Sequence, residues 1–477
     1  MIHYKSLNEA CGVFGIMDRN SSGLGHTIFF GLYALQHRGQ ESCGMAVYDN
    51  HQLRLQKEMG LVNQVFNQTI LDQMTGQVGI GHTRYSTTGT SSLGNAQPVV
   101  VRTNQGALTL AHNGNLTNTN ELTVFLKERG YLGHGDSDSH VMAMTINFML
   151  NTEGCDVEEA VQKALSTCEG AFSIVVATGD TLIAARDPLG LRPLCMGRTR
   201  TGALVFASET AALDIVGATF ERDLLPGEIV SARIDDYYSS LQLQGNGVTT
   251  SAFIESQALA KEEKLCVFEL VYFARPDSTI NQQSVYQYRM NLGKKLAEIS
   301  PPVEADIVIP VPDSGTVAAI GYSRASGIPF AEGLIKNRYV GRTFINPSHE
   351  LREKGIQLKL NPLKDVLYGK RIVVVDDSIV RGNTSRNLVR MLWSCGVKEI
   401  HLRVSSAKVT HPCFYGIDMS QPAELIANQQ PDTEAIRQFL GVTTLMYLSV
   451  ENMVSLSGFS DPCTACFSGK YPGAVPA

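Results

Sequence analysis

No stretch of this 477-residue sequence is apolar for long enough to cross a membrane. The first ten residues, Met-Ile-His-Tyr-Lys-Ser-Leu-Asn-Glu-Ala, also lack the apolar core of a secretion signal. Positive charge is scarce, because 46 Asp and Glu outnumber 40 Lys and Arg and leave a net charge of −6. Such a balance gives no electrostatic footprint for nucleic acid. We therefore expect a cytoplasmic protein with no membrane and no nucleic-acid partner.

Two further absences narrow the class of protein. The ten cysteines are scattered along the chain and do not form the dense pattern of a secreted disulfide framework. A GxxxxGK[ST] phosphate loop is missing, which disfavours an NTPase. The sequence is 43% hydrophobic and 18% charged, as in an ordinary globular protein. Its length is sufficient for two or three domains.

A run of β-branched residues marks the most informative stretch. Ile372 to Val375 show no polar alternation, which predicts a strand buried on both faces, as in a parallel sheet. Asp376 and Asp377 follow where this strand would leave the sheet, and adjacent acids there suit a ribose diol or a hydrated Mg²⁺. The turn from Gly382 to Ser385 opens a helix whose free N–H groups can hold a phosphate. The alternative is a solvated acidic turn after a buried strand.

A second stretch repeats this arrangement. Asp306 to Gly315 contains another buried strand and ends in Asp-Ser-Gly, and a helix predicted over 316–326 has its N-terminus available for pyrophosphate. The basic segment from Lys336 to Asn361 is either a solvated face or a mobile lid over an anionic substrate. The stretch from Arg371 to Ser385 resembles the phosphoribosyl pyrophosphate (PRPP) motif of type I phosphoribosyltransferases.

Near the start of the chain, Cys11 opens the block Cys-Gly-Val-Phe-Gly-Ile, and a free cysteine is most often a buried small hydrophobe. Three later fragments favour a reactive thiol. Arg84 can grip an α-carboxylate, and Asp138 can pair with an α-ammonium. The Asn113 amide and the Gly114 N–H can form an oxyanion hole. Singly, Arg84 also fits a structural ion pair and Asn113-Gly114 a hairpin turn.

Four fragments together, beginning at Cys11, Leu35, Gly81 and His112, are similar to glutamine amidotransferase domains of the N-terminal-nucleophile type. The resemblance implies that cleavage after Ala10 exposes Cys11 as the new N-terminus. Its α-amino group, with a pKa near 8, can then relay the thiol proton. No histidine is needed as the base, so His37, His82 and His112 are expected to be structural.

With both halves counted, the chain resembles the amidophosphoribosyltransferase family over nearly its whole length. The resemblance implies a mixed α/β and α+β fold. A propeptide at 1–10 precedes an αββα N-terminal-nucleophile domain over 11–245, and a type I phosphoribosyltransferase domain with a parallel sheet covers 255–477. The polar stretch 241–251 is expected to be the junction. The implied partners are glutamine, PRPP, purine nucleotides as feedback inhibitors, and further copies of the chain in a homo-oligomer.

The family match assigns roles residue by residue. For catalysis it points to Cys11, Asn113 and Gly114, and for glutamine to Arg84 and Asp138. For PRPP it points to Asp376, Asp377, Ser378, Arg381, Gly382, Asn383, Thr384 and Ser385, and for Mg²⁺ to Ser314, Asp376 and Asp377. Two positions depart from the family pattern, Asn383 where Thr is common and His349 where the lid usually carries Gln.

Four cysteines are candidates for a metal centre. Cys463 and Cys466 form a Cys-x-x-Cys pair, and Cys266 and Cys413 bring the set to four thiolates. From the residues alone this set suits a tetrahedral zinc or a 4Fe–4S cluster. The resemblance favours the cluster, because one branch of the family carries a propeptide and such a cluster together. The other cysteines are expected to be inert: Cys43, Cys155, Cys168, Cys195 and Cys395.

Two other functions compete with this interpretation. Another glutamine-dependent synthetase would need an ATP-pyrophosphatase loop, and no Ser-Gly-Gly-x-Asp-Ser sequence is present. A non-catalytic PRPP-sensing regulator would have no use for Cys11, Arg84 and Asn113 together, and no DNA-binding module is apparent.

Overall fold

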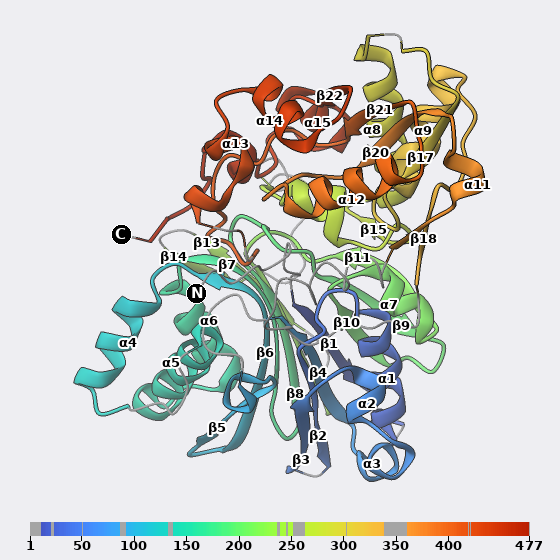
Figure 1. The fold of residues 1–477 in the computed structure, drawn as a ribbon. Helices are drawn as coiled ribbons and strands as arrows, with labels where there is room; N and C mark the ends of the chain where they lie inside the picture. The colour runs from blue at the N-terminus through green and yellow to red at the C-terminus, as the bar shows by residue number, and fades with distance from the viewer. Residues whose placement is uncertain are drawn as a thin grey trace.

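The computed structural model describes residues 11–20, 23–49, 51–85, 92–131, 137–235, 239–244, 247–250, 263–301, 303–337, 360–417, 419 and 421–476. The chain forms two bodies, the first built by the N-terminal half (blue to green in Figure 1) and the second by the C-terminal half (yellow to red). Within these ranges, no helix combines the length and the apolar character that a membrane span requires.

Two seven-stranded sheets form the first body. One has the order β11-β9-β10-β1-β4-β2-β3 and the other the order β14-β13-β12-β8-β7-β6-β5. The first comprises β1 (Gly12–Met17), β2 (Ser42–Asp49), β3 (Gln52–Met59), β4 (Val78–Arg84), β9 (Cys195–Thr199), β10 (Leu204–Ala207) and β11 (Ala218–Asp223). The second comprises β5 (Val99–Thr103), β6 (Gly106–Leu116), β7 (Gly170–Ala177), β8 (Thr181–Arg186), β12 (Glu228–Arg233), β13 (Ser239–Gln244) and β14 (Gly247–Thr250).

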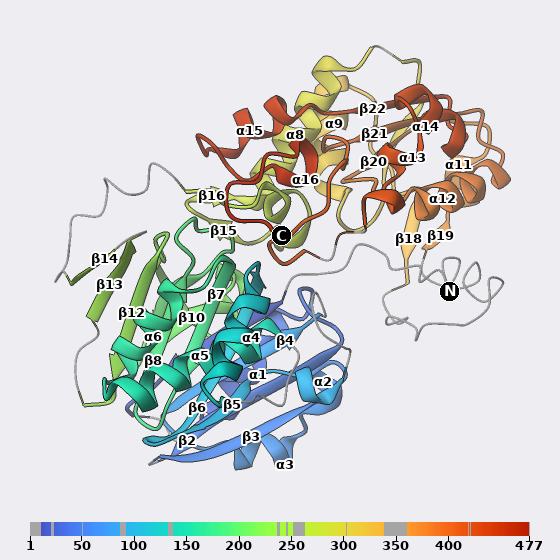
Figure 2. The ribbon, with the colours of Figure 1, turned by 90° about the vertical axis from the view of Figure 1, so that its left-hand side faces the viewer.

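Helices cover the outer face of each sheet, giving four layers (Figure 2). On one side lie α1 (Leu24–Ala34), α2 (Val62–Val65), α3 (Gln68–Gln73) and α7 (Thr210–Ile215); on the other lie α4 (Thr119–Glu128), α5 (Asp138–Glu153) and α6 (Val157–Ser166). Three apolar cores separate the layers, and the middle one joins Val13 and Ile80 of one sheet to Ala111 and Val175 of the other. The αββα prediction is confirmed.

The predicted junction differs from the structure. Residues 239–244 and 247–250 form the antiparallel strands β13 and β14, and β13 pairs with β12 in the second sheet. The polar composition suggested a linker because an edge hairpin needs little apolar surface. The sheet therefore extends past residue 245, and the domain boundaries themselves stay a prediction.

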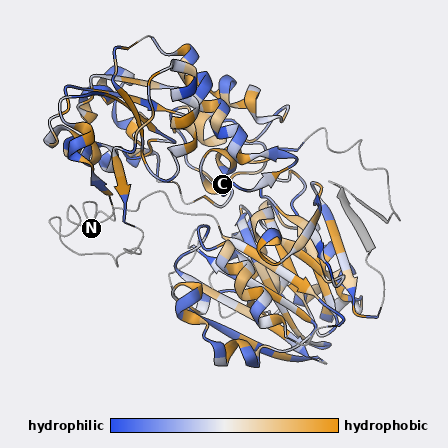
Figure 3. Ribbon diagram, turned by 90° about the vertical axis from the view of Figure 1, so that its right-hand side faces the viewer, coloured by the Kyte–Doolittle hydropathy of each residue, from blue (hydrophilic) through white to orange (hydrophobic). Residues whose placement is uncertain are grey.

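The second body has a four-stranded parallel sheet in the order β17-β20-β21-β22, as predicted. Its strands are β17 (Ile307–Pro310), β20 (Arg371–Asp376), β21 (Glu399–Val404) and β22 (Thr444–Tyr447), and the short ladders are β15 (Thr279–Ile280) with β16 (Gln283–Ser284) and β18 (Leu334–Lys336) with β19 (Leu360–Pro362). Figure 3 shows the hydrophobic colour concentrated on the strands of both bodies.

Helices pack on both faces of the parallel sheet. The longer ones are α8 (Val285–Ile299), α9 (Thr316–Ser326), α12 (Asn383–Ser394), α14 (Thr433–Leu440) and α15 (Val450–Ser457). Shorter segments are η1 (Leu93–Asn95), the π-helical turn η4 (Glu269–Phe273), α11 (Lys364–Leu367), η5 (Pro422–Glu424), α13 (Ile426–Gln429) and α16 (Ala465–Ser468). One apolar core lies under α8 and α9 and another under α12 and α14. The helix predicted over 316–326 is α9.

Two candidate active centres

Cys11 lies directly before β1, whose ladder with β4 pairs Gly12 with Thr83. The residue is only 7% exposed, and its Sγ donates to the Tyr85 carbonyl oxygen at 3.5 Å. The Arg38 Nε donates to the Cys11 carbonyl oxygen at 2.9 Å. Burial raises the pKa of the Cys11 thiol above its ordinary value, so the thiol needs a base to become nucleophilic.

Asn113 and Gly114 lie on β6, which faces β1 across the middle core. The Asn113 side chain is fully buried, and in the described part of the chain neither its Nδ2 nor its Oδ1 has a hydrogen-bond partner. A buried amide without a partner is costly and indicates a group that a ligand completes. Gly114 has φ +146°, and a Cβ there would lie 2.0 Å from the Ala171 carbonyl oxygen, so only glycine fits.

Arg84 and Asp138 act on the same thiol. The charge of Arg84 lowers the pKa of Cys11 and that of Asp138 raises it, although burial remains the largest influence. Arg84 Nη1 also lies 3.7 Å from Glu41 Oε2, and Asp138 Oδ2 accepts the Leu116 N–H at 3.1 Å. The structure therefore places Arg84 and Asp138 within electrostatic reach of the Cys11 thiol.

The three histidines near this centre have structural partners. His82 Nε2 lies 2.9 Å from the His112 carbonyl oxygen, and His112 Nδ1 lies 3.1 Å from Ser139 Oγ. His37 Nε2 lies 2.8 Å from Glu209 Oε1. Burial lowers the pKa of His82 to about 3, which keeps that ring neutral at physiological pH.

The second centre lies at the carboxyl end of β20. Asp376 and Asp377 are 8% and 4% exposed, and the Asp377 N–H donates to Asp376 Oδ1 at 3.0 Å. The hydroxyls of Ser314 and Ser378 donate to the two oxygens of Asp377. Burial raises the pKa of both carboxyls, and the charge of Asp377 raises that of Asp376 further. The charge of Arg289 lowers the pKa of Asp377, but burial has the larger effect, so this pair of acids needs a further cation to ionise fully.

Two helix N-termini flank these acids. Gly382, with φ +77°, precedes α12, whose first residues are Asn383, Thr384 and Ser385. No side chain caps α12 or α9. The N–H of Thr316, the first residue of α9, donates to the Asp313 carbonyl oxygen at 3.2 Å, so an anion would meet the N–H groups that follow it in α9 and the first N–H groups of α12. Arg381 is held by Glu424, with Nη2 2.9 Å from Oε2. The predicted lid falls mostly on residues 338–359, including His349, which lie outside the described residues.

Oxygen ligands suit Mg²⁺, yet no group of three or more His, Cys, Asp or Glu in the described ranges could hold a metal ion by itself. Ser314, Asp376 and Asp377 supply a hydroxyl and two carboxylates, and Mg²⁺ usually completes its shell with water and substrate phosphates. The donor set therefore fits a cation that arrives with a phosphorylated substrate.

The four candidate cysteines also gather. Cys266 and Cys463 pair as an isolated parallel bridge, and the N–H groups of Thr410 and His411 donate to the Cys466 carbonyl oxygen. Burial raises the pKa of Cys466 well above its ordinary value, and the charges of Cys266, Cys413 and Cys463 raise it further. The thiols are thus close enough to repel one another as thiolates, a repulsion that a cationic cluster would remove. Among the described residues, however, no three or more of these cysteines form a group that could hold a metal ion.

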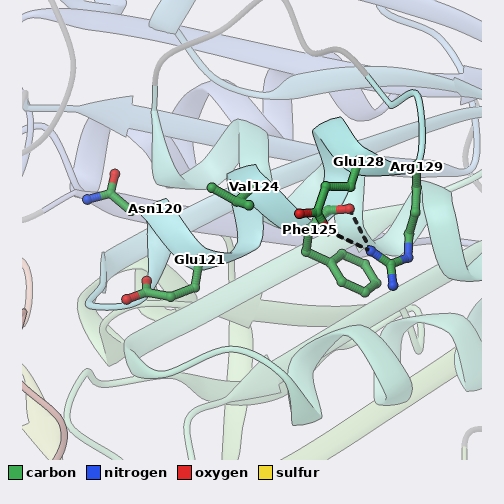
Figure 4. Close-up of a pocket in the computed structure, with 6 residues that line it drawn as sticks. All are labelled: Asn120, Glu121, Val124, Phe125, Glu128 and Arg129. Atoms are coloured by element: carbon green, nitrogen blue, oxygen red, sulfur yellow. Dashed lines mark hydrogen bonds and ion pairs between the residues drawn. The ribbon is translucent and has the colours of Figure 1, made fainter.

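Five further cysteines are buried, namely Cys43, Cys155, Cys168, Cys195 and Cys395. An open hollow lies beside α4 (Figure 4), lined by Asn120, Glu121, Val124, Phe125, Glu128 and Arg129. No predicted site residue lines it.

Sequence reasoning assigned no role to Arg38 or Glu269. Both are fully buried, and Arg38 Nη2 lies 2.7 Å from Glu269 Oε1. Arg38 lies in the segment from Leu35 to Ser42 and Glu269 in the segment from Cys266 to Ser278. In the sequence, 231 positions separate the two partners. Only the fold brings them together.

Comparisons with known proteins agree with this geometry. A family model described as a glutamine amidotransferase domain matches residues 82–214. The chain is 50% identical to an amidophosphoribosyltransferase of Synechocystis sp., over 99% of this chain and 93% of that protein. It is 45% identical to the amidophosphoribosyltransferase of Methanocaldococcus jannaschii, over 98% of each.

Solved structures match along the same length. The glutamine PRPP amidotransferase of B. subtilis, complexed with ADP and GMP, superposes with a TM-score of 0.87 at 42% identity and covers 98% of both chains. A structure described as the allosteric regulatory enzyme of purine biosynthesis gives a TM-score of 0.87 at 43% identity, over 98% of this chain and 97% of that one.

Proposed function

The chain belongs to the amidophosphoribosyltransferase family, and we propose that its two centres divide the reaction of that family between Cys11 and the Asp376–Asp377 pair. The enzyme transfers the amide nitrogen of glutamine to PRPP and forms 5-phosphoribosylamine, glutamate and pyrophosphate. This is the first committed step of purine synthesis. The full-length similarity supports the reaction, and the buried Asn113 amide, which has no hydrogen-bond partner among the described residues, supports the assignment of the first centre.

In the first centre, the Cys11 thiolate attacks the glutamine side-chain amide. The α-amino group exposed by removal of residues 1–10 takes the thiol proton and returns it to the leaving ammonia. The amide of Asn113 and the N–H of Gly114 donate to the oxyanion of the tetrahedral intermediate. Arg84 and Asp138 hold the α-carboxylate and the α-ammonium. Water then hydrolyses the thioester and releases glutamate.

In the second centre, ammonia displaces pyrophosphate from the ribose of PRPP. The N-termini of α9 and α12 hold its phosphates, and Ser378, Arg381, Gly382, Asn383, Thr384 and Ser385 form the 5′-phosphate loop. Ser314, Asp376 and Asp377 would hold Mg²⁺, which when bound neutralises developing charge on pyrophosphate. The carboxylates also stabilise positive charge on the ribose.

The four cysteines Cys266, Cys413, Cys463 and Cys466 would hold a 4Fe–4S cluster with a structural role. Their convergence from three separate segments supports this, because a cluster would fasten the C-terminal tail to the body. Zinc remains the rival, and metal analysis of the anaerobically purified protein distinguishes them.

Purine nucleotides are proposed as feedback inhibitors, supported by the ADP and GMP complex of the B. subtilis relative. A nucleotide 5′-phosphate can share the anion site at α12, so inhibition by ADP or GMP should compete with PRPP in steady-state kinetics. The homo-oligomer and the cytoplasmic location also stay proposals, and light scattering tests the first.

The variant Cys11→Ala tests the division of labour. Glutamine-dependent synthesis should fall by roughly 10⁴-fold or more, since the nucleophile is gone. Synthesis from ammonia and PRPP should survive within about twofold, because the second centre is untouched. Loss of both activities in a folded Cys11→Ala protein would contradict the assignment.

A further inference from the structure

A fully buried ion-pair cluster joins the two halves of the molecule. It consists of Arg38, Arg192 and Glu209 from the first half and Glu269 from the second, each at most 1% exposed. Arg38 lies 2.7 Å from Glu269 and 2.5 Å from Glu209, and Arg192 lies 3.0 Å from Glu269. Buried ion pairs add little net stability over apolar packing, so this cluster calls for another reason to be present.

One arm of the cluster, through Arg38, contacts the proposed nucleophile Cys11. The Arg38 guanidinium donates to both carboxylate oxygens of Glu269, from Nη1 at 3.0 Å and from Nη2 at 2.7 Å. This bidentate contact fixes the plane of the guanidinium. The third nitrogen, Nε, then donates to the Cys11 carbonyl oxygen. The ladders of β1 with both of its neighbours leave Cys11 unpaired, so Arg38 supplies the support that the sheet does not.

The other arm, through Arg192, contacts the segment that packs against Gly114 of the proposed oxyanion hole. The Arg192 Nε donates to the Tyr415 carbonyl oxygen at 2.9 Å. The next residue, Gly416, lies against Gly114 so closely that a Cβ on it would meet the Gly114 carbonyl carbon at 2.6 Å. Asn115 Nδ2 also donates to the Phe414 carbonyl oxygen at 2.9 Å. The segment from Phe414 to Gly416 therefore backs the strand that carries Asn113 and Gly114.

The backbone around Glu269 is held by hydrogen bonds from Arg289. It begins the turn η4, and Arg289 of α8 donates to two carbonyl oxygens of this region, Leu270 at 2.9 Å and Ala274 at 2.8 Å. The carboxylate thus sits on a fixed piece of the second body while it contacts two arginines of the first.

We propose that Glu269 is a positioning residue for the amide-hydrolysis centre, acting through Arg38 on Cys11 and through Arg192 on the strand of Asn113 and Gly114. This inference rests on the proposed roles of Cys11 and Asn113. It makes the first centre incomplete without a carboxylate of the second half.

The test compares two neutralised carboxylates in the full-length processed protein, Glu269→Gln and Glu263→Gln. Glu263 is a matched control, since it pairs with Arg186 at 2.5 Å, is also buried, and also joins the two halves. The hydrogen bonds of Glu263 in the described residues come from Arg186 and Asn281, and Arg186 reaches Arg192 at its backbone carbonyl oxygen, not at the guanidinium that Glu269 contacts. Both variants should melt at a lower temperature than the parent.

Glu269→Gln should lower kcat for glutamine-dependent synthesis about 10- to 100-fold, because misplacement of reacting groups costs factors of this size. The KM for glutamine should change little, since Arg84 and Asp138 keep their places. The alkylation rate of Cys11 by iodoacetamide should fall, and ammonia-dependent activity should stay within about twofold. Glu269→Asp, which keeps the charge, should recover part of kcat.

Equal ratios of glutamine- to ammonia-dependent kcat in Glu269→Gln and Glu263→Gln would overturn the inference. If Glu269→Gln does not fold, Gly416→Ala carries the same test through the second arm, because alanine clashes with Gly114. An unchanged ratio in Gly416→Ala would then overturn it. Persistent glutamine activity in Cys11→Ala would instead overturn the proposed function.

Discussion

The two centres handle their buried charges in opposite ways. Around Cys11, the cations Arg38, Arg84 and Arg192 each lie within 4 Å of a carboxylate of the protein. Beside β20, the carboxylates of Asp376 and Asp377 are stabilised by hydroxyls and by one backbone N–H. The first centre neutralises its own charges, and the second leaves negative charge for an incoming cation.

This difference matches the two substrates. Glutamine is a zwitterion, and its amide carbon gains charge only in the transition state, so fixed donors such as the Asn113 amide suffice. PRPP is a polyanion that binds with a divalent cation, so helix N-termini and unneutralised acids suit it. The first centre should therefore be insensitive to chelation of Mg²⁺ and the second wholly dependent on it.

After Cys11→Ala, the largest effect is expected from Asp377→Asn. It removes one carboxylate of the pair, and PRPP turnover should fall by roughly 10³-fold with either glutamine or ammonia as nitrogen source. Alkylation of Cys11 by a glutamine-like affinity label should continue. The control is Asp365→Asn, an exposed acid of α11. Parental turnover in Asp377→Asn would remove this residue from the centre.

Asn113→Ala should affect only glutamine-dependent activity, by about 10²- to 10³-fold in kcat, as for loss of an oxyanion donor. The Asn113 amide has no partner to lose among the described residues, so the melting temperature should move by no more than about 3 °C. Asn118→Ala, whose amide does donate to the Thr167 carbonyl oxygen, is the control. A marked loss of stability with parental kcat would show that Asn113 is structural.

The sequence predicted the elements that are specified by neighbouring residues, and it missed the contacts that depend on distant segments. The strand at Ile372–Val375 and the helix after Gly382 were predictable, because an apolar run and a glycine turn are local signals. The β13–β14 hairpin was misjudged as a junction, because its apolar alternation is confined to Leu241 and Leu243 and is followed by a run of turn and polar residues. Arg38 and Glu269 were out of reach, because a charged residue gains its buried partner only when two distant segments meet.

Removal of the cysteine pair gives a smaller effect that spares both centres. In Cys463→Ser/Cys466→Ser, the unfolding free energy should fall by about 2–4 kcal/mol, the range of a crosslink that closes a long loop. Iron and acid-labile sulfide should disappear together. Cys395→Ser, a buried cysteine of another core, is the control. Stoichiometric zinc in the parent, or full stability of the double variant, would contradict the cluster.

The last expected effect is a pH dependence of stability with opposite signs in the two halves. Burial lowers the pKa of His82 to about 3, whereas an unfolded histidine titrates near 6.5. Below pH 6.5 the unfolded chain therefore binds a proton at His82 that the folded chain does not bind. Stability should fall by up to about 1.4 kcal/mol per pH unit between roughly pH 6.5 and pH 3.

The acids of the second centre act the other way. Burial raises the pKa of Asp376 and Asp377 above that of an unfolded aspartate, so the folded chain binds protons first as the pH falls. Their contribution therefore increases stability on mild acidification. Urea unfolding between pH 7 and pH 5 separates the two effects, because Trp393 is the single tryptophan and lies on α12 of the second half. His82→Gln should flatten the acid loss seen by circular dichroism, and an identical pH slope in His82→Gln and the parent would refute the assignment.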